Sequence, residues 1–426
     1  MEPIGSTQSF KSVNDWLPWL ESLSPREIVL GLERVLQMLE RLNLSRPMIV
    51  INVGGTNGKG SSVAILESLL LKKGLTTGCY MSPHLNYYNE RIRINGEPVN
   101  DVIILKAFER VEFVRQEIPL TFFEFGTLVA LVAFQMCDVE AWVLEVGMGG
   151  RLDAVNAIEP DAVLITNISL DHCAWLGKNI ESIGREKAGL MRNSIPAIIG
   201  MSNPPDSIKK VANEVLADLR IQGEDYSYEM NNDDSWNWFG QELNFKNLCF
   251  PSLSGSFQIN NAAAALAVLE SIDFFSLSDY QLINKALNHI SLEGRQQIIG
   301  NKWILDVAHN PDAAGVLAHM LGSLSFNGKI TAIIGLFEDK DVEGFLLPLL
   351  SYVDYFIATG ISGDRGLSAN KMARCIANIS NKPCLVIDEI EVALEFIDKK
   401  TDFDDRVLVT GSFQVVGPAL KWLKSV

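Results

Sequence analysis

The segment from Met48 to Lys73 constrains the fold more than any other part of the chain. It joins a short apolar run, the glycine-rich turn GGTNGKGS at 54–61 and an apolar-rich helical stretch. A strand that enters such a turn and continues as a helix directs several backbone N–H groups and the positive helix end at one point, which suits a phosphate. Lys59 would then reach the β- and γ-phosphates of a nucleotide. The match to GxxxxGK[ST] is imperfect, because Val53 replaces the first glycine and Gly60 precedes Ser61. A tight strand–helix turn without a ligand is the alternative.

Up to residue 295, strand-like and helix-like runs alternate, which indicates a doubly wound, mainly parallel sheet. The run 26–42 predicts a helix with Val29, Leu32, Val35, Leu36, Leu39 and Leu42 on one face. Strands are expected at 48–53, 77–81, 141–146, 162–166 and 197–199, and helices at 101–116, 122–136, 178–190, 259–271 and 278–290. The polar, irregular stretch 204–256 predicts a small antiparallel addition.

The alternation begins again after residue 295, so the chain is expected to contain a second α/β domain. Its strands are predicted at 302–307, 330–335, 353–358, 383–387 and 406–410, and its helices at 312–323, 340–350, 367–378, 389–399 and 414–424. We therefore expect two domains, 1–295 and 296–426, with a cleft between them.

Bulk properties exclude several classes of protein. The net charge of −16 disfavours a nucleic-acid partner, and no apolar run approaches the roughly 18 residues of a membrane span. The N-terminal sequence lacks the basic start and apolar stretch of a signal peptide. Six scattered cysteines form no CxxC pair, which fits a reducing compartment. A cytoplasmic, monomeric protein is expected.

Five polar clusters each follow the expected C-terminal end of a strand, where open α/β sheets bind ligands. They are the turn 54–61, the segment 82–84, the segment from Glu145 to Asn156, the pair Asp171-His172 and the segment 306–311. Taken alone, Glu145 could be a salt-bridge partner, and His172 a helix cap or core residue. Lys187 could be an ordinary surface charge. The repeated placement at strand ends favours one shared site.

Together these clusters resemble the folylpolyglutamate synthase/dihydrofolate synthase family, a branch of the Mur-type ligases. The matching segments run in the family's order along nearly the whole chain: GTNGKGS (55–61), SPHL (82–85), ERIRING (90–96), TFFEF (121–125), EVGMGGRLDAVN (145–156), DH (171–172), EKAG (186–189), Asn261, GR (294–295), DVAHNP (306–311), DKD (339–341) and VTGSFQVVG (409–417). The resemblance implies a P-loop-type N-terminal domain and a Rossmann-like C-terminal domain, with ATP between them.

Site residues follow from this resemblance position by position. It implies that ATP contacts Thr56, Asn57, Gly58, Lys59, Gly60, Ser61, Asn261, Arg295, Asp306 and His309. It implies Mg²⁺, in two ions, held by Ser82 and Glu145 and by His172. It implies a folate or pteroate site made by Leu30, Gly31, Leu32, Thr121, Phe122, Phe123, Glu124, Leu152, Asp153 and Ala154. Asp153 could hydrogen-bond the pterin ring, or it could instead cap a helix.

The reaction implied is an ATP-dependent ligation of L-glutamate to dihydropteroate, to reduced folates such as tetrahydrofolate, or to both. The γ-phosphate would first activate the carboxylate as an acyl phosphate, which the amine of glutamate then attacks. Lys59, Lys187 and His172 are the expected catalytic residues, and the resemblance implies that Lys187 is carboxylated on its ε-nitrogen.

Two positions depart from the family pattern. Glu293 precedes Gly294-Arg295 where a proline is common, and Phe257 stands where Gly-x-His-Gln has its histidine.

Two other functions are compatible with part of the sequence. One is a Mur-type ligase that acts on a cell-wall nucleotide precursor, although the chain has no additional domain before the strand at 48. The other is a non-catalytic nucleotide-gated binding protein, which would need neither Arg295 and Asp306 nor paired metal ligands.

Overall fold

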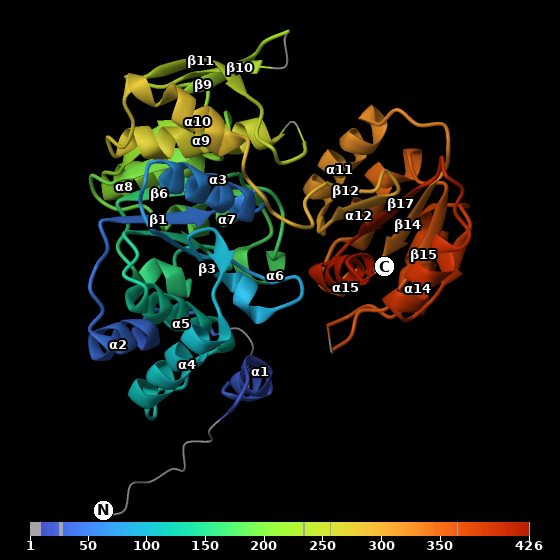
Figure 1. Ribbon diagram of the computed structural model, residues 1–426, viewed down its shortest axis with the longest axis horizontal. Coiled ribbons are helices and arrows are strands. Elements are labelled where there is room, and N and C mark those ends of the chain that lie inside the picture. Colours follow the sequence, from blue (N-terminus) through green and yellow to red (C-terminus); the bar gives the residue numbers. More distant parts are fainter. Residues whose placement is uncertain (1–9, 25–28, 233–234, 256, 364, 426) are drawn as a thin grey trace, which may run out of the picture.

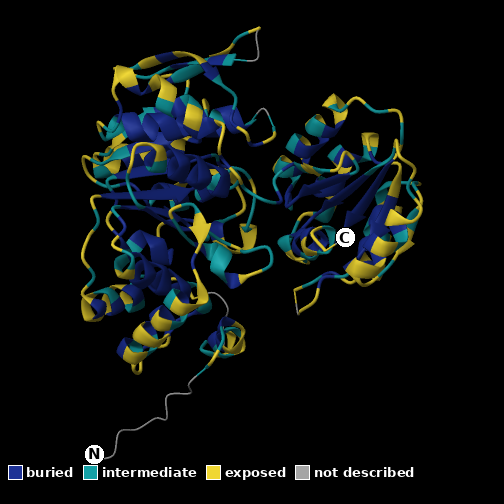
Figure 2. Cartoon of the chain, viewed as in Figure 1, coloured by how far each residue is buried: buried dark blue, intermediate teal, exposed yellow. Residues whose placement is uncertain are grey.

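The computed structural model describes residues 10–24, 29–232, 235–255, 257–363 and 365–425. Two α/β bodies lie side by side, as Figure 1 shows, and the chain crosses from one to the other after helix α10 (Tyr280–Leu287). The first body contains an eight-stranded and a three-stranded sheet, and the second contains a six-stranded sheet. Figure 2 shows that buried residues are concentrated on the sheets and on the inner faces of the helices.

The eight-stranded sheet is the frame of the larger body. In spatial order its strands are β4 (Glu97–Pro98), β3 (Ile92–Ile94), β2 (Thr77–Tyr80), β5 (Ala141–Glu145), β1 (Ile49–Gly54), β6 (Ala162–Ile165), β7 (Pro196–Ile199) and β8 (Asp218–Ile221). Strands β2, β5, β1, β6, β7 and β8 are parallel, and β3 and β4 add an antiparallel edge. The central strands are buried on both faces, which explains why they are continuous apolar runs rather than alternating ones.

Helices cover both faces of this sheet. One apolar cluster unites the sheet with α1 (Val13–Ser22), α2 (Glu33–Leu42), α4 (Asp101–Arg115), α5 (Phe122–Met136), α7 (Ile180–Ala188) and α8 (Asp206–Val215). On the other face a second cluster includes α3 (Lys59–Lys72), α9 (Phe257–Ser271) and α10. Short helices α6 (Cys173–Leu176), η1 (Tyr88–Arg91), η2 (Ala154–Ala157) and η3 (Leu277–Asp279) complete this body.

A three-stranded antiparallel sheet packs beyond α9 and α10. It consists of β9 (Ser227–Met230), β10 (Ser235–Phe239) and β11 (Asn244–Cys249). The fully buried Trp236 and Trp238 alternate along β10 and fix its inner face against the α9 side of the core. The indole N–H of Trp238 donates to the carbonyl oxygen of Ala263 at 3.0 Å, which ties the small sheet to α9.

The smaller body is a six-stranded sheet between two layers of helices. Its strands, in spatial order, are β12 (Gln297–Ile299), β13 (Trp303–Asp306), β17 (Arg406–Thr410), β14 (Ile330–Ile334), β15 (Tyr355–Ala358) and β16 (Cys384–Val386). Only β12 is antiparallel among the described strands of this sheet. One face carries α11 (Pro311–Ser323), α12 (Val342–Leu346), η4 (Leu347–Ser351) and α13 (Ala369–Ile379), and the other carries α14 (Ile390–Asp398) and α15 (Phe413–Leu423).

The helix predicted over 26–42 begins later than expected. Residues 26–28 lie outside the described residues, and the helix starts at Glu33, with Leu32 as its N-terminal flanking residue. Its buried side chains are Val35, Met38 and Leu42, whereas Leu36 is exposed. The prediction was wrong there because the apolar side chains at 29–32 belong to the segment that precedes the helix, which is not helical.

The stretch 204–256 was also only partly predicted. Its second half is the antiparallel addition, but its first half is α8 followed by β8, which joins the main sheet in parallel. The edge strands β3, β4 and β12 were not predicted either, because each is short and depends on its neighbours for burial. Helix α1 was also not predicted, and it contains a proline, Pro18, inside the helix. Within the described ranges, no helix combines the length and apolar character that crossing a membrane requires.

Truncating a side chain at the centre of the main sheet should destabilise the larger body. Ile51 lies in β1 and is fully buried, so Ile51→Ala removes contacts and leaves a cavity. We expect the free energy of unfolding to fall by about 2–4 kcal/mol in urea denaturation. The control Ile180→Ala, at an exposed position, should change it by less than about 0.5 kcal/mol. Equal midpoints for the two variants would contradict this account of the core.

Candidate functional site

The glycine-rich loop is held against the end of the neighbouring strand β6. The N–H of Thr56 donates to the carbonyl oxygen of Asn167 at 3.0 Å, and the N–H of Asn57 donates to its side-chain oxygen at 2.7 Å. The hydroxyl of Thr166 donates to the carbonyl oxygen of Asn57 at 2.6 Å. Gly55 has a φ of +139°, and a Cβ there would lie 1.9 Å from the Thr166 hydroxyl oxygen. Only glycine allows the loop to approach β6 this closely.

Helix α3 starts inside the glycine-rich segment 54–61, at Lys59. Gly58, with a φ of +84°, precedes it, and no side chain caps its first turn. The backbone N–H groups of that turn are therefore directed out of the helix end without a capping side chain, as an anion site requires.

The ammonium groups of two lysines contact the backbone carbonyl oxygens of the loop. The ammonium of Lys59 donates to the carbonyl oxygens of Gly55 at 3.3 Å and Thr56 at 3.1 Å. The ammonium of Lys187, which is 3% exposed, donates to the same Gly55 oxygen at 2.7 Å. Burial lowers the pKa of Lys59, and burial followed by repulsion from Lys59 lowers the pKa of Lys187 to about 7. Lys187 is therefore a buried amine that is partly neutral near physiological pH, and not a surface charge.

Glu145 approaches the loop from the end of β5, and Arg295 approaches it from the domain junction. The N–H of Ser82 donates to a carboxylate oxygen of Glu145 at 3.1 Å, so these two predicted ligands are neighbours. A Cβ placed on Gly60 would lie 3.8 Å from both the Glu145 carboxylate and the Arg295 guanidinium. Burial raises the pKa of Glu145, while the charge of Lys59 acts in the opposite direction.

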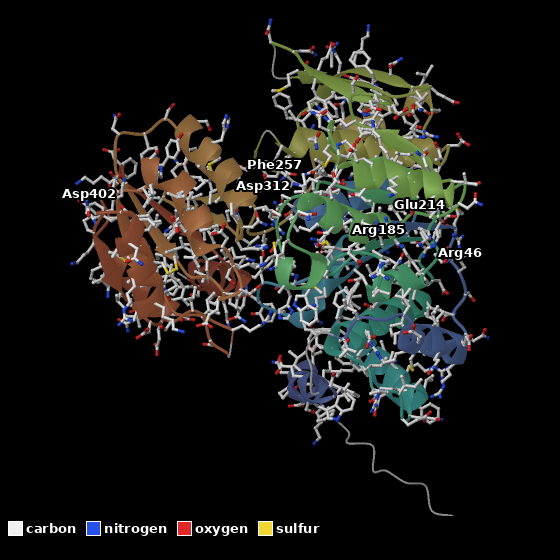
Figure 3. All side chains as sticks on the ribbon, turned by 180° about the vertical axis from the view of Figure 1, so that it is seen from behind. Arg46, Arg185, Glu214, Phe257, Asp312 and Asp402 are labelled. Carbon is white, nitrogen blue, oxygen red and sulfur yellow. The ribbon has the colours of Figure 1, made fainter. Side chains whose placement is uncertain are left out.

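A cavity opens between the two bodies at this point. Figure 3 places Phe257 and Asp312 near the boundary between them. Both belong to its lining. The lining also includes, from the first domain, Asn57, Gly58, Ser61, Thr166, Asn167, Asn260, Asn261 and the junction residue Arg295, and, from the second domain, Gln296, Asp306, Val307, Ala308, His309, Ala313 and Val316. The cavity thus has a polar end at the loop and an apolar wall on α11. This distribution of polar and apolar residues suits a nucleotide, which has a flat base and charged phosphates.

The predicted ATP residues of the second half line this same cavity. The buried carboxylate of Asp306 accepts hydrogen bonds from the N–H groups of Gln296 at 2.8 Å and Ala308 at 2.7 Å. Arg295 stacks over the ring of Phe413 at 5.4 Å, which orients the guanidinium. Asn261 donates to Gln258, and Gln258 in turn donates to the hydroxyl of Ser61 at 3.2 Å. Sequence positions far apart therefore meet at one site.

His172 lies at the rim of the site, just before α6. Its backbone is in the left-handed region, with a φ of +51°. Its pKa is lowered to about 4, first by burial, so its imidazole is neutral and able to bind a metal ion. Within the described residues, no group of three or more His, Cys, Asp or Glu side chains is arranged to hold a metal by itself.

The three segments predicted to bind the folate lie near one another, around η2. Helices α2 and α5 both pack against η2, which brings the ends of 30–32, 121–124 and 152–154 into one region. The Phe123 ring lies over Gly147, where an added Cβ would be 2.5 Å from it. The ring of Tyr80 is 5.7 Å from that of Phe123.

Two acidic residues in this region already have structural partners. The carboxylate of Glu124 accepts from the N–H of Thr121 at 2.8 Å and pairs with Arg34 at 2.7 Å. Asp153 caps η2 by accepting from Val155 at 3.0 Å and also accepts from Met148 at 2.9 Å. The helix-cap alternative for Asp153 therefore describes its contacts in the structure. Burial nevertheless raises the pKa of Asp153 to about 6.

His84, in the second polar cluster, is also a structural partner. Its Nδ1 accepts from the guanidinium of Arg91 at 2.8 Å. Burial and the charge of Arg91 lower the pKa of His84 to about 4, so this histidine is neutral.

The two departures from the family pattern have clear structural consequences. Glu293, in place of a proline, pairs with Lys424 at 2.5 Å and so connects the domain junction to α15. Phe257, in place of a histidine, begins α9 and contributes an apolar wall to the cavity.

Several residues of the site had no assigned role in the sequence analysis. Asp171, Asn310, Asp312 and Lys340 bridge the two bodies next to the loop. The segments DH, DVAHNP and DKD contained the signal for three of them, but only the fold shows that they face each other.

Comparisons with known proteins agree with this arrangement. The Mur ligase middle domain matches residues 53–269, and the glutamate ligase domain of Mur ligases matches 294–413. A dihydrofolate synthase/folylpolyglutamate synthase of Escherichia coli is 37% identical over 417 residues, covering 97% of this chain and 96% of the relative. The structure of Escherichia coli FolC in complex with DHPP and ADP has a TM-score of 0.92 and 36% identity, with 99% of each chain covered.

A second solved structure is a bifunctional folylpolyglutamate synthase/dihydrofolate synthase from Yersinia pestis, complexed with AMPPNP and Mn ion. It has a TM-score of 0.90 and 39% identity, and the match covers 99% of this chain and all of that one. The agreement in length, order of motifs and fold leaves one conclusion. This chain belongs to the dihydrofolate synthase/folylpolyglutamate synthase family of Mur-type ligases.

Proposed function

We propose that the chain is an ATP-dependent ligase that joins L-glutamate by an amide bond to the carboxylate of dihydropteroate and of reduced folates. The observation that carries this proposal is the cavity between the bodies, where the loop at 54–61 faces Arg295 and Asp306. A ligase needs nucleotide phosphates, a carboxylate to activate and an amine in one enclosed place, and this junction provides one. We place the domain boundary between 295 and 296, because β12, the first strand of the six-stranded sheet along the chain, starts at Gln297.

We infer that the phosphates lie on the start of α3, between Thr56 and Ser61. The first-turn N–H groups and Lys59 provide the positive field, while Arg295 approaches from the domain junction. Lys59 now donates to two loop carbonyls, and a triphosphate is a stronger acceptor for its ammonium. The base lies towards Phe257 and α11, with Asn261, Asp306 and His309 along the nucleotide.

A divalent cation fits the residues beside this loop. The relative from Yersinia pestis was solved with Mn ion, and we propose Mg²⁺ in two ions for this chain. Ser82 and Glu145 are adjacent and supply hard oxygen donors for one ion, and neutral His172 is available to the other. When bound, the ions neutralise charge on the transferring phosphoryl group.

The folate end of the substrate is proposed to lie against α2, α5 and η2. Apolar side chains of Leu30, Leu32 and Phe123 offer surfaces for a flat ring, and Asp153 offers a buried carboxyl group. The 121–124 segment is fixed by its capping box and by Arg34, so its shape is set before substrate arrives.

The proposed reaction requires a site that the two domains enclose. Transfer of the γ-phosphate to the substrate carboxylate forms an acyl phosphate, and the glutamate amine then displaces phosphate. Water would hydrolyse this intermediate, so the two domains must cover it during the reaction. The contacts that join the domains at the loop provide this cover.

Replacing Lys59 by alanine should abolish turnover. The phosphates lose their nearest side-chain cation, and we expect kcat/KM for ATP to fall at least about 100-fold in a coupled ADP-release assay. Lys72→Ala, on the exposed end of the same helix, is the control and should retain full activity. Near-normal activity of Lys59→Ala would refute the ATP site.

The substrate range can be tested with two acceptors in parallel. We expect the purified protein to add glutamate both to dihydropteroate and to tetrahydrofolate, with ADP and amide product in a ratio of about one. Product formation is followed by mass spectrometry, with omission of glutamate as the control. Extension of tetrahydrofolate alone would remove the dihydrofolate synthase activity and leave the ligase assignment intact.

We also propose that Lys187 carries a carboxyl group on its ε-nitrogen. A neutral amine adds CO₂ to form a carbamate, and the burial that lowers the Lys187 pKa keeps part of this amine neutral. The carbamate is an anion, so it turns a like-charge contact with Lys59 into an attractive one. It also offers oxygen atoms to a cation near His172.

Two measurements test this modification. With ¹³C-labelled bicarbonate, the native protein should show a carbamate resonance that Lys187→Ala lacks. The variant should lose at least about 100-fold in kcat and recover part of it with acetate. Arg185→Ala, on an exposed position of the same helix, is the matched control. Full activity of Lys187→Ala without any additive would exclude the proposal.

A further inference from the structure

Asp171 collects more partners than any function assigned so far requires. One oxygen of its carboxylate accepts from the ammonium of Lys340 at 2.6 Å and from the N–H of His172 at 2.8 Å. The other accepts from the amide of Asn310 at 3.3 Å and lies 3.6 Å from Nε2 of His309. Lys340, His309 and Asn310 belong to the second domain, so one carboxylate of the first domain holds three groups of the second.

The ion pair between Asp171 and Lys340 is buried. Both side chains are 8% exposed, although they come from different domains and are separated by 169 residues. A buried pair of this kind is costly to break, because each charge is then left without its partner. It differs in this respect from the pair Lys302–Asp398 inside the second domain, whose side chains are 24% and 44% exposed.

The same contact region extends to the glycine-rich loop. The side chains of Asn57 and Asn310 exchange hydrogen bonds at 3.3 and 3.0 Å. Asn57 also donates to Asp312 at 2.8 Å, and Asn167 donates to Asp312 at 3.2 Å. Asn310 and Asp312 lie at the start of α11, so this helix is joined to the loop through side chains at its first turn. The loop and the second domain are therefore positioned together.

We propose that Lys340 is a positioning residue. Through its buried ion pair with Asp171 it holds the second domain closed over the glycine-rich loop. This closure protects the acyl phosphate from water. Asp171 precedes His172, and its carboxylate fixes the backbone of that histidine, so closure and the placement of His172 depend on the same group. The proposal rests on the proposed ligase function for its chemical consequence, but not for its structural one.

Loss of the pair has two distinct consequences. Without Lys340 the Asp171 carboxylate regains hydration by opening towards solvent, and the domains separate more often. In an open site water competes with the glutamate amine for the acyl phosphate, so ATP is consumed without amide formation. A residue that merely stabilises the fold would lower both products in parallel.

The variant Lys340→Met removes the charge and keeps an unbranched side chain. In small-angle X-ray scattering of the ligand-free protein, we expect a larger radius of gyration than for the native chain. With all substrates, we expect the ratio of ADP to amide product to rise from about one to at least two, and KM for glutamate to increase at least fivefold. Lys340→Arg, which restores a cation, should recover most of the coupling. Lys302→Met is the matched control and should resemble the native protein in scattering and in coupling.

Asp171→Asn serves as a second variant if Lys340→Met does not fold. It keeps the shape of the side chain and the contact with His172, and it should show the same expansion and the same excess of ADP. An unchanged radius of gyration and a ratio that stays at one in either folded variant would overturn the proposal. Expansion in a protein that ligates no folate acceptor would uphold the positioning role and refute the ligase function instead.

Discussion

The close approach of the glycine-rich loop to the end of β6 is the constraint on which the site depends. Gly55 lies so near the hydroxyl of Thr166 that no side chain fits, and Thr166 and Asn167 bind the loop backbone directly. This contact sets the direction in which α3 starts, and therefore the point at which its N–H groups converge. The parallel order of β5, β1 and β6 then brings Glu145 and Asp171 to the same edge of the sheet. A side chain at Gly55 would move the loop and disperse the whole arrangement.

Charge is the second organising element, because this site buries cations and anions together. Lys59, Lys187 and Arg295 lie within or beside the loop, and Glu145, Asp171 and Asp306 surround them. Burial alone would neutralise many of these groups, yet their mutual attraction holds them in place. Contact with His309 and the charge of Lys340 outweigh the burial of Asp171 and keep its pKa well below the usual value. The cleft thus keeps charges of both signs beside the loop.

Regular elements were predicted wherever an apolar pattern is local and long. The strand before the loop, helices α4, α5 and α9, and the parallel strands of the six-stranded sheet lie at nearly the expected positions. Each of them shows its burial as an apolar period of two or 3.6 residues or as a continuous apolar run. The failures share a different cause. Strands β3, β4, β8 and β12 are short. In addition, β8 follows helix α8, which was not predicted because the stretch 204–256 is largely polar. Such segments become strands because a neighbouring strand offers unpaired N–H and carbonyl groups, and this information lies elsewhere in the chain.

The sequence by itself determined the glycine-rich loop, the family and the identity of the polar residues at the strand ends, because glycines, lysines and carboxylates at fixed spacing leave few chemical alternatives. Only the tertiary structure decided what those residues do to one another. It excluded the alternative that Lys187 is a surface charge by burying its amine against Gly55, and it committed Asp153 and Glu124 to capping and pairing. It also joined Asp171 to Lys340 across the cleft. Burial and contact between distant residues depend on how two domains meet, and no local pattern of residues encodes that meeting.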